Sequence, residues 1–366
     1  MGKRIDKNKS PFTRKATRPV KVGEMYIGSG HPVLVQSMTS TDTRDIAATL
    51  AQIGRLAEAG CELVRVAVPD SKAVAAFEKI VAASSLPVVA DIHFDYRLAL
   101  AAVDAGAAKL RINPGNIGSP ERVRRIAEAA VKRKIPIRIG VNSGSVEKHL
   151  LERHGGPVPE ALVESALNHC SLLEDAGFED IVVSLKASDV LTTVAANRLF
   201  ATRKDYPLHL GVTEAGMRGR GTVVSSVGLG IMLSDGLGDT VRVSLTADPV
   251  EEVAVAWRIL AALKIRRRGV EIISCPTCGR TEVDLIGLAE EVERRLSTLN
   301  LPLTVAVMGC VVNGPGEAKE ADFGIAAGRG GGVIFRKGEK VCKVSESRLV
   351  ERLVGIISEE TGTEIP

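Results

Sequence analysis

The chain is poor in aromatic residues, which make up 3% of its 366 positions, and it contains no basic run interleaved with aromatics. Such a composition argues against a dedicated nucleic-acid surface. No apolar run is long enough for a membrane span, and residues 1–20 are basic and polar, without the apolar stretch of a secretory signal. We therefore expect neither a nucleic-acid partner nor a membrane partner.

The distribution of cysteines argues against a small protein stabilised by disulfides. The six cysteines are spread through a long chain in which 25% of residues are charged, and this is not the pattern of a disulfide framework. Cys61 and Cys170 stand alone, as small buried hydrophobes do. A reducing, cytoplasmic location is the expectation.

Strand-like and helix-like segments alternate over the first two thirds of the chain. Short β-branched runs at 33–37, 63–68, 87–92, 109–112, 135–141, 180–185, 208–212 and 240–245 are each followed by an amphipathic stretch, for example 46–59, 97–105, 121–133 and 250–263. Alternation of this kind predicts a parallel sheet. Eight units in about 250 residues favour a closed (β/α)8 TIM-type barrel over an open doubly wound sheet. No G-x-G-x-x-G motif follows the first strand, which weakens a dinucleotide-binding alternative.

The pattern changes after the basic segment 264–269, which we interpret as a linker. Beyond it we expect a helix over 282–296, a strand over 303–308, a hairpin with strands 333–335 and 341–344, and a final helix over 346–358. The prediction is a barrel domain over residues 1–265 that binds substrate, followed by a small α+β metal domain over residues 270–366.

Basic residues recur inside the apolar strand-like runs, where an unpaired charge is costly. Period-two alternation places each on one face together with polar residues near the carboxyl end of its strand, where barrel enzymes carry their active sites. Converging guanidinium groups suit a phosphate or diphosphate. The expected anion site comprises Arg65, Arg111, Asn113, Arg138, Asn142, Lys186, Arg242 and Ser244.

Two carboxylates, Asp91 and Glu214, are the only obvious acidic partners for these cations. Both are candidates for acid–base catalysis, and Glu214, followed by Gly216, has no evident packing role. His93 suits proton transfer or substrate contact, and a structural role fits it equally well. An isolated arginine in a barrel strand is usually paired and structural, but four at similar depth favour an anion site.

Cys275-Pro-Thr-Cys278 and the more distant Cys310 offer three thiols to one soft metal centre. Cys342 lies in a strand-like run, and Glu317 follows Cys310 across a glycine-rich bend; either could supply a fourth ligand. From spacing alone, a structural zinc site and an iron–sulfur cluster both remain open.

Taken together, the motifs resemble the 4-hydroxy-3-methylbut-2-enyl-diphosphate synthase family of the non-mevalonate isoprenoid pathway. The resemblance extends along nearly the whole chain and is carried by Pro32-Val-Leu-Val-Gln-Ser-Met-Thr39, Ala90-Asp-Ile-His-Phe94, Arg111-Ile-Asn-Pro-Gly-Asn116, Arg138-Ile-Gly-Val-Asn142, Gly211-Val-Thr-Glu-Ala-Gly216, Gly238-Asp-Thr-Val-Arg-Val-Ser244, Ser274-Cys-Pro-Thr-Cys-Gly-Arg280 and Met308-Gly-Cys-Val-Val-Asn-Gly-Pro-Gly-Glu317. One departure is Val224, which precedes Ser225 where many relatives carry lysine.

The resemblance implies an oxidoreductase with a [4Fe–4S] cluster bound by Cys275, Cys278, Cys310 and Glu317, so that Cys342 is not a ligand. It implies a cyclic diphosphate substrate, 2-C-methyl-D-erythritol 2,4-cyclodiphosphate, which two electrons from flavodoxin or ferredoxin open with loss of water. It further implies a homodimer in which the cluster domain of one subunit closes over the barrel of the other. The competing hypothesis is a barrel enzyme of aldolase or pterin-binding type whose cysteines bind structural zinc.

Overall fold

The computed structural model describes residues 10–310, 316, 319 and 321–365. The chain divides into two compact units, and the boundary falls between Arg266 and Arg267, inside the predicted linker. Among the described residues, none of the helices combines the length and apolar character that crossing a bilayer requires.

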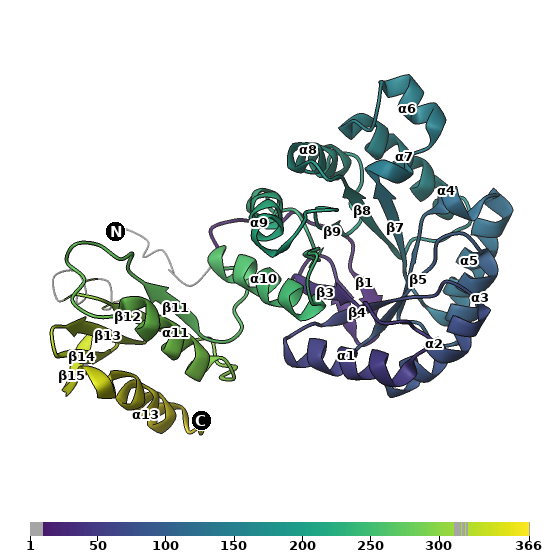
Figure 1. Cartoon of the computed structure of the whole chain (residues 1–366). Coiled ribbons are helices and arrows are strands. Elements are labelled where there is room, and N and C mark those ends of the chain that lie inside the picture. Colours follow the sequence, from purple (N-terminus) through teal and green to yellow (C-terminus); the bar gives the residue numbers. More distant parts are fainter. Residues whose placement is uncertain (1–9, 311–315, 317–318, 320, 366) are drawn as a thin grey trace. The chain divides into compact units, whose positions relative to one another are not determined.

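The first unit is built around eight parallel strands in the order β8-β7-β6-β5-β4-β3-β10-β9 (Figure 1). A bridge between Val183 and Leu208 brings the two ends of this sheet together into a barrel. The predicted TIM-type fold is confirmed, although the last two strands are much shorter than predicted. The strands are β3 (Leu34–Met38), β4 (Leu63–Ala67), β5 (Val88–Asp91), β6 (Lys109–Ile112), β7 (Ile137–Asn142), β8 (Ile181–Lys186), β9 (His209–Leu210) and β10 (Thr240–Val241).

Helices connect successive strands and surround the barrel (Figure 1). Several begin after an aspartate whose carboxylate accepts a backbone N–H of the first turn, as Asp45, Asp70 and Asp248 do. They are α1 (Ile46–Glu58), α2 (Ser71–Ala83), α3 (Tyr96–Asp104), α4 (Pro114–Ile117), α5 (Pro120–Arg133), α6 (Lys148–His154), α7 (Pro159–Glu174), α8 (Val190–Ala201), α9 (Arg218–Ser234) and α10 (Pro249–Ala262), with a 3₁₀ turn, η1, at Ser143–Ser145.

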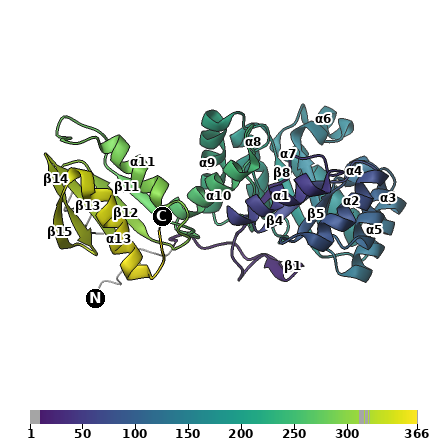
Figure 2. The same cartoon turned by 60° about the horizontal axis from the view of Figure 1, so that its bottom comes forward.

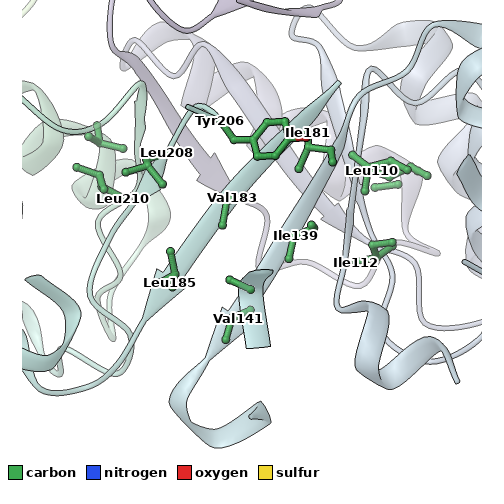
Figure 3. Packing of buried hydrophobic residues seen from close by; sticks show 14 of the residues in the cluster. Leu110, Ile112, Ile139, Val141, Ile181, Val183, Leu185, Tyr206, Leu208 and Leu210 are labelled. Carbon is green, nitrogen blue, oxygen red and sulfur yellow. The ribbon is translucent and has the colours of Figure 1, made fainter. Parts of the chain in front are cut away.

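Alternation along the strands separates an apolar face from a polar one. Leu110, Ile112, Ile139 and Val141 belong to the large apolar cluster shared with the helices (Figure 3). The residues between them, including Arg111 and Arg138, therefore point into the barrel. Burial of each large aliphatic side chain contributes about 1.5–3 kcal/mol, so the outer layer fixes which face turns inward.

The amino-terminal end of the barrel is closed by an antiparallel hairpin, β1 (Val20–Val22) and β2 (Met25–Ile27). Its side chains form a separate apolar cluster with residues at the starts of the barrel strands, such as Leu34, Leu63 and Val182. The chain before the hairpin is held by Arg14, which donates to buried Asp239 at 2.6 Å. The barrel interior is consequently sealed by apolar packing at this end.

The second unit has a five-stranded sheet in the order β11-β12-β13-β14-β15, parallel as far as β13 and antiparallel beyond it. The helices α11 and α13 lie on the same side of this sheet and share its apolar core (Figure 2). The predicted hairpin is present as β14–β15, with positive φ at Lys337 and Gly338 in the turn. The elements are β11 (Glu271–Ser274), α11 (Leu285–Leu296), β12 (Thr304–Met308), β13 (Phe323–Gly328), β14 (Gly331–Arg336), β15 (Glu339–Ser345), η3 (Glu346–Arg348) and α13 (Leu349–Thr361).

The Arg14–Asp239 contact predicts a stability effect. Asp239 also accepts from the Leu208 backbone N–H at 2.9 Å and from the Thr17 hydroxyl at 3.1 Å. Because Asp239→Ala leaves these donors unsatisfied, we expect the free energy of unfolding to fall by about 2–4 kcal/mol in urea titrations followed by circular dichroism. Asp205→Ala, which removes an exposed ion pair to Arg18, is the control and should change it by less than about 1 kcal/mol. Equal effects of the two changes would contradict this account of Asp239.

Candidate functional site

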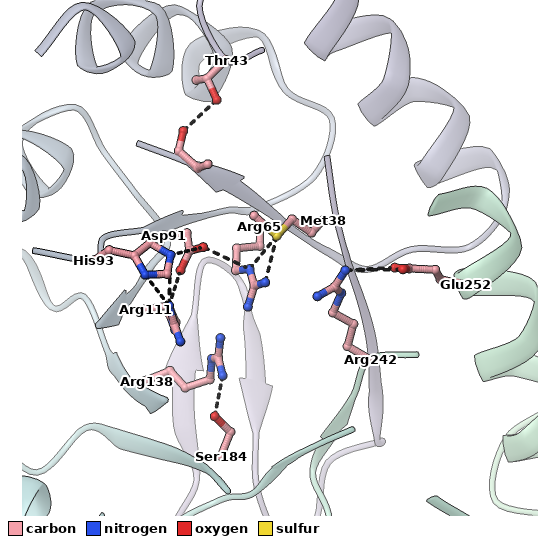
Figure 4. Close-up of polar contacts among 11 residues, drawn as sticks. Met38, Thr43, Arg65, Asp91, His93, Arg111, Arg138, Ser184, Arg242 and Glu252 are labelled. Atoms are coloured by element: carbon pink, nitrogen blue, oxygen red, sulfur yellow. Dashed lines mark hydrogen bonds and ion pairs between the residues drawn. The ribbon is translucent and has the colours of Figure 1, made fainter. Parts of the chain in front are cut away.

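The inward face of the barrel carries a cluster of basic side chains near the carboxyl ends of the strands. Arg111 on β6 pairs in register with Asp91 on β5 and with Arg138 on β7. The guanidinium groups of Arg65, Arg111, Arg138 and Arg242 all point toward a common interior space (Figure 4). The predicted convergence of these four arginines is therefore seen in the structure.

Asp91 is the acidic centre of the cluster. Its carboxylate lies 3.2 Å from Nη1 of Arg111, 3.7 Å from Nε of Arg65 and 3.3 Å from Nε2 of His93. Burial alone would raise the pKa of Asp91, but Arg65, His93 and Arg111 together hold it well below its usual range. Asp91 is thus a permanent anion that orients these side chains, while the His93 ring is half exposed at the edge of the cluster.

Arg138 and Lys186 have no carboxylate partner among the described residues. Nη1 of Arg138 donates to the Ser184 hydroxyl at 2.5 Å, and its Nε and Nη2 are buried without a hydrogen bond. Burial lowers the pKa of both Arg138 and Lys186 well below the ordinary value, and the neighbouring arginines lower it further. An anion placed between them would reverse this shift.

Arg242 is paired with a carboxylate that the sequence did not indicate. Glu252, on α10, lies 3.3 Å from Nη2 of Arg242 and also accepts from the Ser37 hydroxyl at 3.2 Å. The sequence predicts Glu214 as the second carboxylate partner of the arginines, and this pairing is wrong because Glu252 takes that place. Sequence reasoning missed Glu252 because it lies on a helix, and nothing in the helical pattern indicates that its side chain reaches into the barrel.

Glu214 itself is exposed and makes no ion pair with the described arginines. Its backbone has φ of 53°, in the left-handed region that costs a residue with a side chain roughly 1–2 kcal/mol. Strain of this kind collects at functional sites, because the surrounding structure must hold the residue in place. The conformation sets Glu214 apart from the other carboxylates near the barrel mouth.

Two further buried groups were not predicted. Lys109 donates to the Gln36 side-chain carbonyl at 3.2 Å, and burial lowers its pKa well below the usual value. His209 contacts the Thr240 hydroxyl at 2.7 Å through Nδ1, and its Nε2 is buried without a hydrogen bond. Lys109 precedes Arg111 by two residues, so the same alternation that identified Arg111 would have found it.

The predicted neutral residues lie at or just beyond the carboxyl ends of the strands. Asn113 is buried; its amide oxygen accepts from the Gly115 backbone N–H and its amide nitrogen donates to the Ser145 hydroxyl, both at 3.1 Å. Asn142 and Ser244 are half-buried. Asn113 therefore holds its own loop and retains one amide N–H for a ligand.

The charges of the interior do not balance. Among the described residues, the strands and the segments just after them direct six cationic side chains inward against two carboxylates, Asp91 and Glu252. Space is kept for these side chains at two glycines: a Cβ at Gly140 would lie 2.7 Å from Nε of Arg111, and one at Gly211 would lie 2.7 Å from Nζ of Lys186. Four of the six cations are buried, namely Lys109, Arg111, Arg138 and Lys186, and the other two, Arg65 and Arg242, are 12% and 18% exposed.

In the second unit, two of the three predicted thiol ligands follow neighbouring parallel strands. β11 leads into Cys275 and β12 into Cys310, and the Gly309 backbone N–H donates to Sγ of Cys275 at 3.4 Å. A Cβ at Gly309 would lie 3.1 Å from Thr281, so glycine lets the turn that carries Cys278 approach. Within the described ranges, no three Cys, His, Asp or Glu side chains gather closely enough to hold an ion. Glu317 lies outside the described residues.

Cys342, the alternative fourth ligand, lies on β15 and packs against the apolar core of the second unit. Amide donation to sulfur, as at Cys275, is an interaction that cluster-bound thiolates receive. The donor types around Cys275 and Cys310 therefore fit a soft metal centre, and the complete ligand set stays a prediction.

Known proteins resemble this chain over nearly its full length. The profile described as "GcpE TIM-barrel domain" matches residues 17–257, and that described as "GcpE protein C-terminal domain" matches residues 271–359. The 4-hydroxy-3-methylbut-2-en-1-yl diphosphate synthase (flavodoxin) of Lawsonia intracellularis is 60% identical over 96% of this chain and 97% of the relative. The enzyme of the same name from Clostridium perfringens is 57% identical over 94% and 99%, respectively.

Among solved structures, dihydropteroate synthase from Yersinia pestis matches 67% of this chain and 98% of its own, with a TM-score of 0.48 and 13% identity. A likeness of that size supports no statement about chemistry. The family profiles and the relatives, by contrast, agree with the family predicted from the motifs: the chain belongs to the GcpE family.

Proposed function

We infer that the protein is a 4-hydroxy-3-methylbut-2-en-1-yl diphosphate synthase, which reductively opens 2-C-methyl-D-erythritol 2,4-cyclodiphosphate. Family membership supports the activity, since relatives at 56–60% identity carry this name. The observation that carries it within the structure is the excess of buried positive charge inside the barrel. A diphosphate is the ligand class that compensates such charge with forked, directional hydrogen bonds.

We propose that the cationic side chains bind the two phosphoryl groups. The charges of Arg138 and Lys186 gain most from a bound anion, because neither side chain has a carboxylate partner among the described residues. Arg65, Arg111 and Arg242 are oriented by Asp91 and Glu252 and retain donors for the ligand. The neutral residues Asn113, Asn142 and Ser244 would add hydrogen bonds around the rim.

We propose that Cys275, Cys278, Cys310 and Glu317 hold a [4Fe–4S] cluster, which when bound supplies the two electrons one at a time. The relatives' names specify flavodoxin, which supports flavodoxin as donor to this chain, with ferredoxin as the alternative. In the overall reaction two electrons are taken up, and the ring C–O bond to one phosphoryl group and a neighbouring C–OH bond both break. A C=C bond forms between the two carbons, both phosphoryl groups stay on the product, and the hydroxyl oxygen takes up a proton and leaves as water.

Glu214 is proposed as the residue that delivers a proton to the departing oxygen. Asp91 is unsuited to that role, because its neighbours keep it ionised, so it would orient the substrate together with His93. The strained backbone of Glu214 supports the assignment, since it fixes an exposed carboxyl group at the barrel mouth.

We propose that the protein is a homodimer. The family resemblance supports the dimer, and sedimentation of the purified protein as a monomer would overturn it.

We also propose a cytoplasmic location. The spread of the six cysteines, which does not match a disulfide framework, supports a reducing compartment. Fractionation of cells that express the protein tests the location.

Gly140→Ala tests whether Arg111 belongs to the anion site. The new Cβ would crowd the Arg111 guanidinium, so we expect KM for the cyclic diphosphate to rise about tenfold, the loss of one charge-assisted hydrogen bond. Gly144→Ala is the control, because a Cβ there meets nothing within 4 Å. Equal KM values for both variants and the unaltered protein would exclude Arg111 from binding.

Glu214→Gln tests the proton donor. We expect kcat to fall by about 100-fold or more, since the amide cannot give up a proton, while iron content and affinity for inorganic pyrophosphate stay unchanged. Full turnover by a variant that retains its iron would show that the assignment is wrong.

The proposed function as a whole is tested by anaerobic purification. We expect a brown protein that contains iron and sulfide and converts the cyclic diphosphate in the presence of a reductant. Cys278→Ala should lose iron, and Cys342→Ala should retain it. A colourless protein with stoichiometric zinc and no turnover would favour the structural-zinc alternative.

A further inference from the structure

A partly buried acid–imidazole pair, Glu147 and His169, lies behind the segment that carries Asn113. Glu147 precedes α6 and His169 lies on α7, and Oε1 of Glu147 is 2.7 Å from Nε2 of His169. The His169 side chain is only 3% exposed. Neither residue belongs to the anion site described above, so the pair calls for a separate explanation.

The carboxylate of this pair is firmly ionised. Burial alone would raise the pKa of Glu147, but the neighbouring His169 and Ser165 lower it to about 2. The His169 side chain is 3% exposed and that of Glu147 is 24% exposed, so displacing Glu147 would leave a buried imidazole without its partner.

The pair meets the backbone of the Asn113 loop at Gly115. A Cβ built at Gly115 would lie 3.1 Å from Nε2 of His169, 3.4 Å from Oε1 of Glu147 and 3.3 Å from Oδ1 of Asn113. A side chain at this position would require the pair or the Asn113 amide to shift by a few tenths of an ångström. The Gly115 backbone N–H in turn donates to the Asn113 amide oxygen, which fixes the rotation of that amide.

A second connection runs from Asn113 to the next strand. Nδ2 of Asn113 donates to the Ser145 hydroxyl, which accepts from the Asn142 backbone N–H at 3.2 Å. Glu147 follows Ser145 by two residues in the same segment. The pair therefore supports, from one side, two loops that both contribute predicted substrate contacts.

We propose that Glu147 and His169 are positioning residues for the diphosphate site, which hold Asn113 and Gly115 at the start of α4 so that the free Asn113 amide N–H faces the bound anion. The proposal rests on the proposed function, because it takes the barrel mouth to be the diphosphate site. Neither residue is assigned contact with the substrate. Displacement of a positioned hydrogen bond by a fraction of an ångström weakens binding without changing the reaction itself.

The chain supplies a matched control on the same two helices. Nε2 of His154, at the end of α6, lies 2.7 Å from Oε2 of Glu164 on α7. This pair joins the same two residue types at the same separation as Glu147–His169, and Glu164 has Arg153 as a further partner. It is more exposed, and no described contact links it to the Asn113 loop, so a general weakening of α6–α7 packing would follow from either pair.

The test compares Glu147→Gln, His169→Gln and the control His154→Gln in the full-length protein. We expect the first two to raise both the Kd for inorganic pyrophosphate, measured by calorimetry, and the KM for the cyclic diphosphate about tenfold. Their kcat values and iron contents should stay within about twofold of the unaltered protein, as expected when only binding is lost. His154→Gln should leave both binding constants unchanged. Should His169→Gln fail to fold, Glu147→Gln, which keeps the shape of the side chain, decides alone.

A double-variant cycle separates positioning from general stability. If the pair acts through Asn113, His169→Gln in an Asn113→Ala background should no longer change the Kd for pyrophosphate. An unchanged Kd in the single variants, even with a lowered Tm, would overturn the proposal, and so would full additivity in the cycle. Failure of the unaltered protein to bind pyrophosphate would instead overturn the proposed function, and this inference with it.

Discussion

Uncompensated positive charge inside the barrel is the constraint on which the site depends. Six basic side chains face inward against two carboxylates, and the protein relieves part of this cost with neutral acceptors: Ser184 for Arg138, Gln36 for Lys109 and Met38 for Arg65. Burial nevertheless lowers the pKa of several of these groups, so the protonated forms are strained without a ligand. A bound polyanion offsets the electrostatic cost of keeping these side chains protonated. Part of the binding free energy of the diphosphate therefore comes from relieving that cost.

The rest of the first unit makes this arrangement possible. Branched aliphatic side chains on the outer faces of the strands pack against the helices. The separate apolar cluster between the β1–β2 hairpin and the starts of the strands closes the amino-terminal end. Polar groups are thus confined to the interior and to the carboxyl ends of the strands, where an anionic ligand can reach them. Glycines at 140 and 211 keep the space that the long basic side chains need.

Local sequence pattern predicted much of this and failed where contacts are distant. Alternation identified the strands, and the bounds of β6 agree with the predicted 109–112, because apolar runs and glycine-containing turns are local signals. The strand expected over 240–245 ends at Val241, since beyond that point Arg242 and Ser244 belong to the segment leading to α10. Glu252 and His169, on helices, and Glu147, just before one, were missed, because contacts with segments distant in sequence leave no periodic pattern. The left-handed backbone of Glu214 likewise has no sequence signal comparable to glycine.

The folded barrel carries an excess of inward-facing positive charge that a bound diphosphate compensates. This compensation is tested most directly by the unfolding temperature of the full-length protein as inorganic pyrophosphate is added. A ligand that binds only the folded state must raise Tm in proportion to the logarithm of its concentration above Kd. The account predicts such a rise with pyrophosphate, and a smaller one with equal concentrations of inorganic phosphate at the same ionic strength. An unchanged Tm at millimolar pyrophosphate would contradict it.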